Sequence, residues 1–176
     1  APPGGHGYHQ LLRQVNVVRG AMTFRMECHP AFNYALDPHE TSISPNGACF
    51  YSPDLSLGLE SSIPLEPSDK GAVAEFTLGE GQAAVFVMGE IERGAACGVP
   101  PSEKEAKDLF EKTVDYWRSW LSKCTYRGRW REMVQRSALV LKLLTYEPTG
   151  AIVASPTCSL PEHLGGQRNW DYRYTW

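Results

Sequence analysis

The sequence predicts an α+β protein in which an antiparallel β-sandwich portion precedes two helices. Apolar residues recur with period two in the first half, the spacing becomes helical after Pro100-Pro101, and turn-forming residues separate the short strands. The 176 residues are 42% hydrophobic, 11% aromatic and 21% charged, which is typical of a globular protein with a packed core.

The first strand signal lies within residues 22–28, where apolar and polar side chains alternate as in a strand with one buried face. Residues 15–17 lead into this strand through Arg19-Gly20-Ala21, so the segment is a hairpin candidate. A loop containing Asp37-Pro38 and Asn46-Gly47 is expected to follow.

Residues 55–59 and 74–78 alternate in the same way and are predicted to be strands. Gly79-Glu80-Gly81-Gln82 predicts a turn, after which Ala83–Met88 returns as a nearly continuous apolar strand. The turn and the two alanines after it also match a loose G-x-G-x-x-A dinucleotide fingerprint. That motif requires a following helix, and a strand-like run follows instead, so a hairpin turn is the preferred interpretation.

Helical spacing begins after Ser102 and Glu105, which form a capping box. Apolar residues then recur at i, i+3 and i+4 as far as Leu121, and Tyr126-Arg127-Gly128 ends this helix. A second apolar stripe extends from Trp130 to Leu144, before Glu147-Pro148 forces an exit. The helical spacing of the aromatic residues favours packing over a sugar platform; these residues are Trp117, Trp120 and Trp130.

Charge and cysteine content exclude several functions. The 17 basic residues are scattered among 20 acidic ones, so a nucleic-acid partner is not expected, and no apolar run approaches the roughly 20 residues of a membrane-spanning helix. The cysteines are widely spaced without a C-x-x-C pair, which favours isolated thiols, a cytoplasmic location and no metal or other cofactor. They are Cys28, Cys49, Cys97, Cys124 and Cys158.

Aromatic and charged residues alternate at the C-terminal end. They are Trp170, Asp171, Tyr172, Arg173, Tyr174 and Trp176. Planar rings that stack on pyranose faces, beside groups that grip hydroxyls, would form a carbohydrate site. A buried aromatic strand with an internal Arg-Asp pair is the alternative that composition leaves open.

Residues 130–157, together with Ser159-Leu160-Pro161-Glu162 and the run RNWDYRYTW at 168–176, closely resemble the opening of the catalytic domain in glycoside hydrolase family fifteen. This family includes glucoamylases, glucodextranases and bacterial-type trehalases. Residues 15–20 and the run PAFNY at 30–34 resemble the later portion of the trehalase-like N-terminal β-domain that precedes the barrel in these enzymes.

The resemblance implies an inverting α-glucosidase with an N-terminal β-sandwich and an (α/α)6 barrel. Residues 1–98 would be part of the β-sandwich domain, residues 99–126 a linker helix, and residues 127–176 the start of the catalytic domain. The first barrel helix would be Trp130–Thr145. The family's two catalytic glutamates would lie beyond residue 176, so no catalytic residue is assigned within this chain.

The resemblance also implies substrate-binding roles near the C-terminal end. Trp170, Asp171, Arg173, Tyr174 and Trp176 would shape or line the subsite for the non-reducing glucose, next to an Arg-Asp dipeptide just beyond residue 176. An internal Asp171–Arg173 salt bridge is an equally acceptable role for that pair. Neither Glu147 nor Glu162 is expected to be catalytic, because each lies beside a proline at a helix end or in a loop, and His163 is expected to be structural or solvated.

The implied partners are an α-glucoside, such as trehalose or an α-glucan, and the rest of the protein's own catalytic domain. Two alternatives remain open. The chain could be a non-catalytic carbohydrate-binding or interaction module that uses the C-terminal aromatic residues, or a truncated product without activity of its own.

Overall fold

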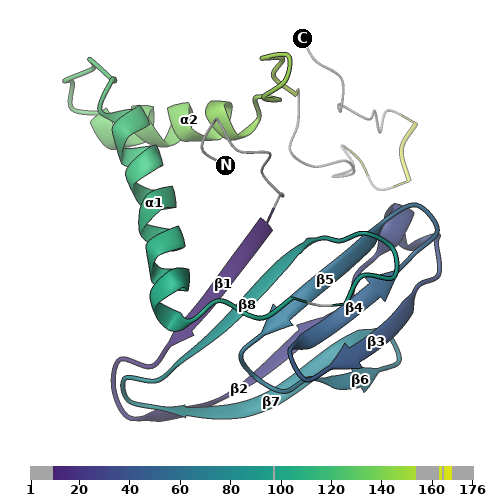
Figure 1. The fold of residues 1–176 in the computed structure, drawn as a ribbon. Coiled ribbons are helices and arrows are strands. Elements are labelled where there is room, and N and C mark those ends of the chain that lie inside the picture. The colour runs from purple at the N-terminus through teal and green to yellow at the C-terminus, as the bar shows by residue number, and fades with distance from the viewer. Residues whose placement is uncertain (1–9, 97, 154–162, 164, 168–176) are drawn as a thin grey trace. The chain divides into compact units, whose positions relative to one another are not determined.

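The computed structural model describes residues 10–96, 98–153, 163 and 165–167 (Figure 1). The chain divides into two compact units, residues 1–114 and 115–176, and helix α1 (Glu103–Leu121) begins in the first and ends in the second. Within the described residues, no helix is long and apolar enough to cross a membrane.

The first unit contains two antiparallel sheets. Sheet A has five strands in the order β1-β8-β5-β4-β3, and sheet B has three in the order β2-β7-β6. Their bounds are β1 Gln10–Asn16, β2 Ala21–Cys28, β3 Glu40–Ser44, β4 Gly47–Tyr51, β5 Ser56–Ser61, β6 Glu66–Ser68, β7 Gly71–Gly79 and β8 Ala83–Glu90. The predicted α+β class is therefore confirmed, with the strands first and the helices after them.

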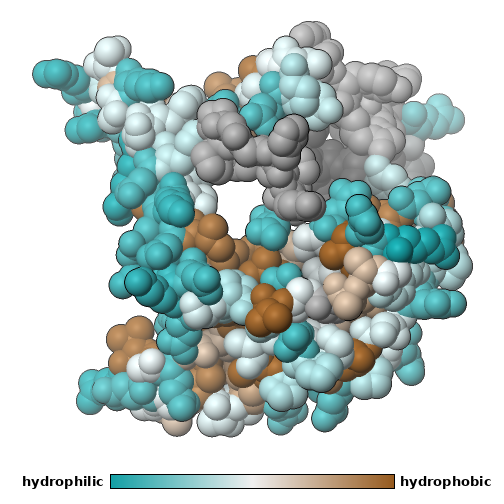
Figure 2. Space-filling model, viewed as in Figure 1, coloured by the Kyte–Doolittle hydropathy of each residue, from teal (hydrophilic) through white to brown (hydrophobic). Residues whose placement is uncertain are grey.

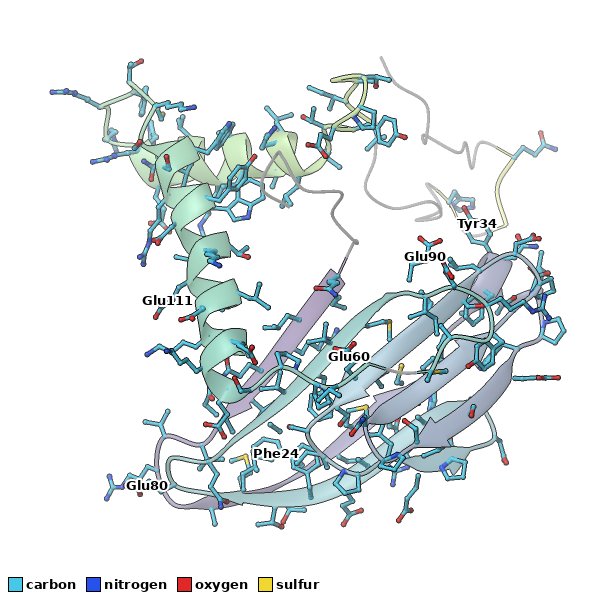
Figure 3. All side chains as sticks on the ribbon, viewed as in Figure 1. Phe24, Tyr34, Glu60, Glu80, Glu90 and Glu111 are labelled. Atoms are coloured by element: carbon cyan, nitrogen blue, oxygen red, sulfur yellow. The ribbon has the colours of Figure 1, made fainter. Side chains whose placement is uncertain are left out.

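The two predicted hairpins are wrong, because the chain changes sheet at each turn. β1 pairs with β8 in sheet A, whereas β2 pairs with β7 in sheet B. The two connections bond to each other instead: Val17 N–H donates to the Gln82 carbonyl at 3.1 Å, and Gly81 N–H donates to the Val17 carbonyl at 2.9 Å. Glu80 lies at this corner of the sandwich (Figure 3) and accepts from the Gly20 N–H at 3.1 Å. The predicted strand at 83–88 is confirmed as part of β8, where a dinucleotide fingerprint would require a helix.

The loop predicted around Asp37-Pro38 and Asn46-Gly47 contains β3 and the start of β4. These strands form a tight hairpin with Ser44 opposite Gly47. Gly47 has a φ of +148°, and a Cβ at this position would collide with the backbone carbonyl oxygen of Leu59. The glycine therefore permits the close approach of β4 to β5. The sequence pattern had placed Gly47 in a loop. The three-residue β6 was also missed.

The core lies between the two sheets. Phe76 of β7 connects them, because its ring centroid is 5.7 Å from that of Phe24 on β2 and 6.0 Å from that of Phe86 on β8 (Figure 3). Phe50 on β4 is fully buried, which stabilises the fold by roughly 1.5–3 kcal/mol relative to an exposed side chain. Alternation in the sequence identified this face correctly for β2, β5 and β7.

Strand β8 is apolar on both faces because sheet A is covered on both sides. Ala84 and Phe86 belong to the core between the sheets. Val85 and Val87 form a second cluster with Ala106 of α1. The continuous apolar run in the sequence therefore reflects a strand buried between a sheet and a helix.

Both predicted helices are confirmed. The capping box at the start of α1 is formed: Ser102 N–H and Oγ donate to Glu105 Oε2 at 2.9 and 2.7 Å, and Glu105 N–H donates back to Ser102 Oγ at 3.3 Å. In the second unit, α2 (Arg131–Leu143) follows the predicted break at residues 126–128.

The prediction of isolated thiols is wrong for one cysteine. Cys49 on β4 is disulfide-bonded, whereas Cys28 and Cys124 are free. Wide spacing in the sequence gave no sign of this bond, because a disulfide depends on the distance that the fold leaves between two Cβ atoms.

Candidate functional site

All the residues predicted to bind sugar lie outside the described residues. They are Trp170, Asp171, Arg173, Tyr174 and Trp176. Glu162 also lies outside them. The structure instead describes the scaffold that leads to this segment.

That scaffold is α2 and the reverse turn after it. Leu144 N–H donates to the Val140 carbonyl at 3.0 Å, and Val153 N–H donates to the Leu144 carbonyl at 3.0 Å. Between them Tyr146 N–H donates to the Ala151 carbonyl at 2.7 Å. The chain therefore reverses direction directly after the helix, so residue 153 lies beside the C-terminal end of α2. Glu147 is exposed within this turn.

No residue of α2 is buried, although the helix has an apolar stripe. Met133, Val140, Leu141 and Leu143 are each more than half exposed. Helices with an apolar stripe normally bury it against another element. The second unit as described therefore lacks the surface that would cover this helix.

The aromatic residues before α2 behave differently from one another. Trp117 and Trp120 of α1 contact edge to face, with ring centroids 6.3 Å apart, which agrees with a packing role. Trp130 is 54% exposed, and the Arg129 guanidinium lies 4.5 Å from its ring centroid. The predicted packing role is therefore not seen for Trp130 among the described residues, where its ring contacts the Arg129 guanidinium.

The first unit contains a cavity of about 640 Å³ that residues of both sheets line. Apolar side chains of both sheets line it, among them Leu11, Met26 and Phe86. Polar residues that line it include Arg13, Glu27, His29, Asn33, Asp37 and Asp54. Its volume falls within the 300–1,000 Å³ that small-molecule sites usually occupy.

A strained turn borders this cavity. Asn33, Tyr34 and Ala35 have φ angles of +45°, +58° and +64°, a left-handed run that residues with a Cβ disfavour. Asn33 Nδ2 donates to Asp37 Oδ1 at 3.2 Å across the turn. The turn lies within the PAFNY run that carried the resemblance, but no pattern in the sequence indicated its backbone strain.

Electrostatics in the cavity do not support catalysis. Burial raises the pKa of Cys28 to about 11, so its thiol is protonated at neutral pH and a poor nucleophile. Arg25 donates to Glu27 at 2.7 Å and, through this bond and its charge, lowers the pKa of that carboxyl. An acid catalyst would require the opposite shift.

Among the carboxyls of the described residues, burial raises the pKa of Glu60, on β5. Glu60 and Glu90 (labelled in Figure 3) line a cleft of about 200 Å³ beside Gly98. This volume is below the usual range for a small-molecule site, and a disaccharide would not fit. Alternation in β5 placed Glu60 on the outer face, but its burial by the segment after β8 could not be read from the sequence.

No three His, Cys, Asp or Glu side chains within the described residues could together hold a metal ion. His163 is exposed. The described part of the chain is thus a β-sandwich unit joined through α1 to the opening of a second, helical unit. This architecture is that of a protein with more than one structural unit.

Comparisons with known proteins agree with this class. Residues 128–176 match the model of "Glycosyl hydrolases family 15". The trehalase of Thermoplasma acidophilum is 35% identical over 98% of this chain and 29% of its own length. The trehalase of Mycolicibacterium smegmatis is 39% identical over 96% of this chain and 26% of its own length. Trehalase 2 of Sulfolobus acidocaldarius is 28% identical over 92% of this chain and 28% of its own length.

Residues 128–176 therefore belong to glycoside hydrolase family 15, and the chain resembles trehalases along nearly its whole length. It spans between a quarter and three tenths of the length of these relatives. No solved structure matches the chain significantly.

Proposed function

We propose that this chain is the part of an inverting, trehalase-type α-glucosidase that contains the end of the N-terminal β-domain and the start of the catalytic domain. The similarity to trehalases over 92–98% of the chain carries this proposal, because it includes both units rather than the barrel segment alone. The relatives' name points to trehalose as the substrate. No observation favours the alternative of a non-catalytic binding module.

The second unit supports a barrel continuation. The uncovered stripe of α2 requires neighbouring helices, and the inner helices of an (α/α)6 barrel have such neighbours on every side. Residues 127–176 would open this barrel, residues 99–126 would be the linker helix and residues 1–98 the β-domain portion. The reverse turn at 146–151 would then direct the aromatic segment toward the end of the barrel where α2 ends.

At that end, Trp170, Tyr174 and Trp176 would stack on or surround the non-reducing glucose, while Asp171 and Arg173 would bond to its hydroxyls or to each other. The chemistry requires two further carboxyls about 6.5–9.5 Å apart, one to protonate the leaving oxygen and one to activate water. These carboxyls would come from the rest of the catalytic domain.

Kinetics of the full-length protein with trehalose, maltose and isomaltose test this proposal. We expect the highest kcat/KM for trehalose, and no glucose release by residues 1–176 alone. Trp176→Ala should raise KM for trehalose roughly 5-fold, because stacking contributes on the order of 1 kcal/mol. Trp176→Phe is the matched control and should recover most of the affinity.

Equal kinetics of Trp176→Ala and the unaltered protein would remove Trp176 from the glucose subsite. Hydrolysis by residues 1–176 alone would contradict the assignment of the catalytic carboxyls to the rest of the protein. Thermal unfolding of each variant shows whether a loss of activity reflects the site or the fold.

A further inference from the structure

The segment between β8 and α1, residues 91–101 and called the connector below, crosses the outer face of sheet A (Figure 1). Figure 2 shows apolar residues among polar ones on this face. At the start of the connector, Ile91 N–H donates to the Ser56 carbonyl at 3.0 Å. A Cβ on Gly58 would lie 2.9 Å from Ile91 Cγ2, so the glycine lets the isoleucine side chain lie directly on β5.

Side chains of β4 hold the middle of the connector. The Tyr51 hydroxyl donates to the Ala95 carbonyl at 3.0 Å, and the Cys49 Sγ lies 3.9 Å from the same oxygen. Ala95 N–H donates to the Glu92 carbonyl at 3.0 Å, so residues 92–95 form a turn beside β4. Cys49 is only 3% exposed.

The last part of the connector covers a carboxyl and leads into α1. Glu60 on β5 lies so close to Gly98 that a Cβ on this glycine would collide with the carboxylate. Burial raises the pKa of Glu60, which agrees with a cover of this kind. Shortly afterwards α1 begins, and its Ala106 packs against Val85 and Val87 of β8. The connector therefore determines how the start of α1 is joined to the sandwich.

The surroundings of Cys49 indicate which cysteine completes its disulfide. Cys28 and Cys124 are free, so Cys97 and Cys158 remain as candidates. Cys97 follows Ala95 by two positions, and the Ala95 carbonyl oxygen is 3.9 Å from the Cys49 Sγ. A disulfide requires Cα atoms within about 7 Å of each other, and two residues of chain span at most about 7 Å. The contact with Ala95 thus favours Cys97.

We propose that Cys49 and Cys97 form this disulfide and that it is a redox-sensitive cross-link between the connector and sheet A. Its formation removes one proton and one electron from each thiol, and a small-molecule disulfide accepts both electrons and becomes two thiols. A dithiol reverses the reaction: its first thiolate forms a mixed disulfide, its second closes the ring, and both cysteines return as thiols. Reducing compartments would therefore release the connector.

Peptide mapping of the full-length protein tests the pairing. The protein is equilibrated with oxidised glutathione, its free thiols are blocked with iodoacetamide, and trypsin then cuts it without reductant. Complete cleavage places Cys49 in residues 26–70, Cys97 in 94–104 and Cys158 in 143–168. We expect a disulfide-linked pair of 26–70 and 94–104. A link from 26–70 to 143–168, or alkylation of Cys49, would overturn the proposal.

Limited proteolysis of the folded full-length protein tests the redox sensitivity. Arg93 is exposed in the turn at 92–95, and trypsin cleaves after it only when the connector is released locally. Dithiothreitol should accelerate this cleavage roughly 10-fold or more, because it removes a covalent loop closure. Cleavage after Arg127, which is exposed between α1 and α2, is the internal control and should not change.

Two variants distinguish the cross-link from other effects of the reductant. Cys97→Ala should be cleaved rapidly after Arg93 with and without dithiothreitol, whereas Cys158→Ala, the matched control, should respond as the unaltered protein does. Equal cleavage of the oxidised and reduced protein would overturn the redox sensitivity, because the noncovalent contacts alone would then hold the connector.

Thermal unfolding of the oxidised full-length protein gives an independent test of the pairing. Cys49→Ala and Cys97→Ala should each lower Tm. The double variant should unfold at about the same temperature as Cys49→Ala, because the second substitution removes a bond that the first has already broken. Additive decreases in Tm would contradict a bond between the two cysteines.

Discussion

At the scale of single residues, the left-handed turn at Asn33, Tyr34 and Ala35 concentrates backbone strain beside the large cavity. Such strain costs of order 1 kcal/mol or more per residue and persists only where the surrounding structure enforces it. The turn is anchored by Phe32, which is buried in the core, and by the Asn33–Asp37 hydrogen bond. These contacts keep the chain in a conformation that its own side chains disfavour.

Ala35→Gly should therefore stabilise the protein by about 1 kcal/mol, because glycine adopts a φ of +64° without the Cβ clash. Ala31→Gly is the matched control: Ala31 has a φ of −121°, so the variant should lose about 0.5–1 kcal/mol through added freedom of the unfolded chain. The free energy of unfolding in denaturant measures both. If both variants lower the free energy of unfolding, the claim that this turn is strained would be contradicted.

At the scale of secondary-structure elements, the start of α1 depends on its capping box and on Ala106, which is fully buried against β8. Hydrogen bonds from Ser102, first from its side chain and then from its backbone, lower the pKa of Glu105. A carboxyl whose pKa is lowered in the folded state stabilises it above the unfolded pKa. This contribution disappears as the pH falls through the folded value.

Ser102→Ala should lower the free energy of unfolding by about 1 kcal/mol at neutral pH, where Glu105 is ionised. The difference between variant and unaltered protein should shrink below about pH 4.5, the ordinary pKa of Glu105, because protonation ends the charged hydrogen bond. Ser119→Ala, an exposed position inside α1, should change stability little at any pH. A cost of Ser102→Ala that is constant down to pH 2 would contradict this account.

The sequence predicted those elements whose signals are local. Alternation identified β2, β5 and β7, and the capping box together with helical spacing identified α1 and α2. Strand partners could not be predicted, because β1–β8 and β2–β7 pairing depends on contacts between residues far apart in the sequence, such as Gln10 with Gly89 and Cys28 with Ala72. β3 and β4 were missed since Asp37-Pro38 and Asn46-Gly47 are typical of loops as well as of hairpins. Trp170–Trp176 could be assigned roles only through the resemblance.

At the scale of the whole molecule, the two units differ in how completely they bury their apolar surface. The first unit has a core between its two sheets, whereas no residue of α2 in the second unit is buried within the described residues. Exposed apolar surfaces of this kind promote association or unfolding when they have no partner.

The anomeric form of the first products of trehalose hydrolysis by the full-length protein tests the central claim most directly. Trehalose joins two α-glucose units at their anomeric carbons. Inversion at the attacked carbon gives β-glucose, while the leaving unit keeps its α configuration. Proton NMR within the first minutes, before mutarotation, should show equal amounts of α- and β-glucose. Release of α-glucose alone, or no hydrolysis of trehalose, would contradict an inverting trehalase-type enzyme.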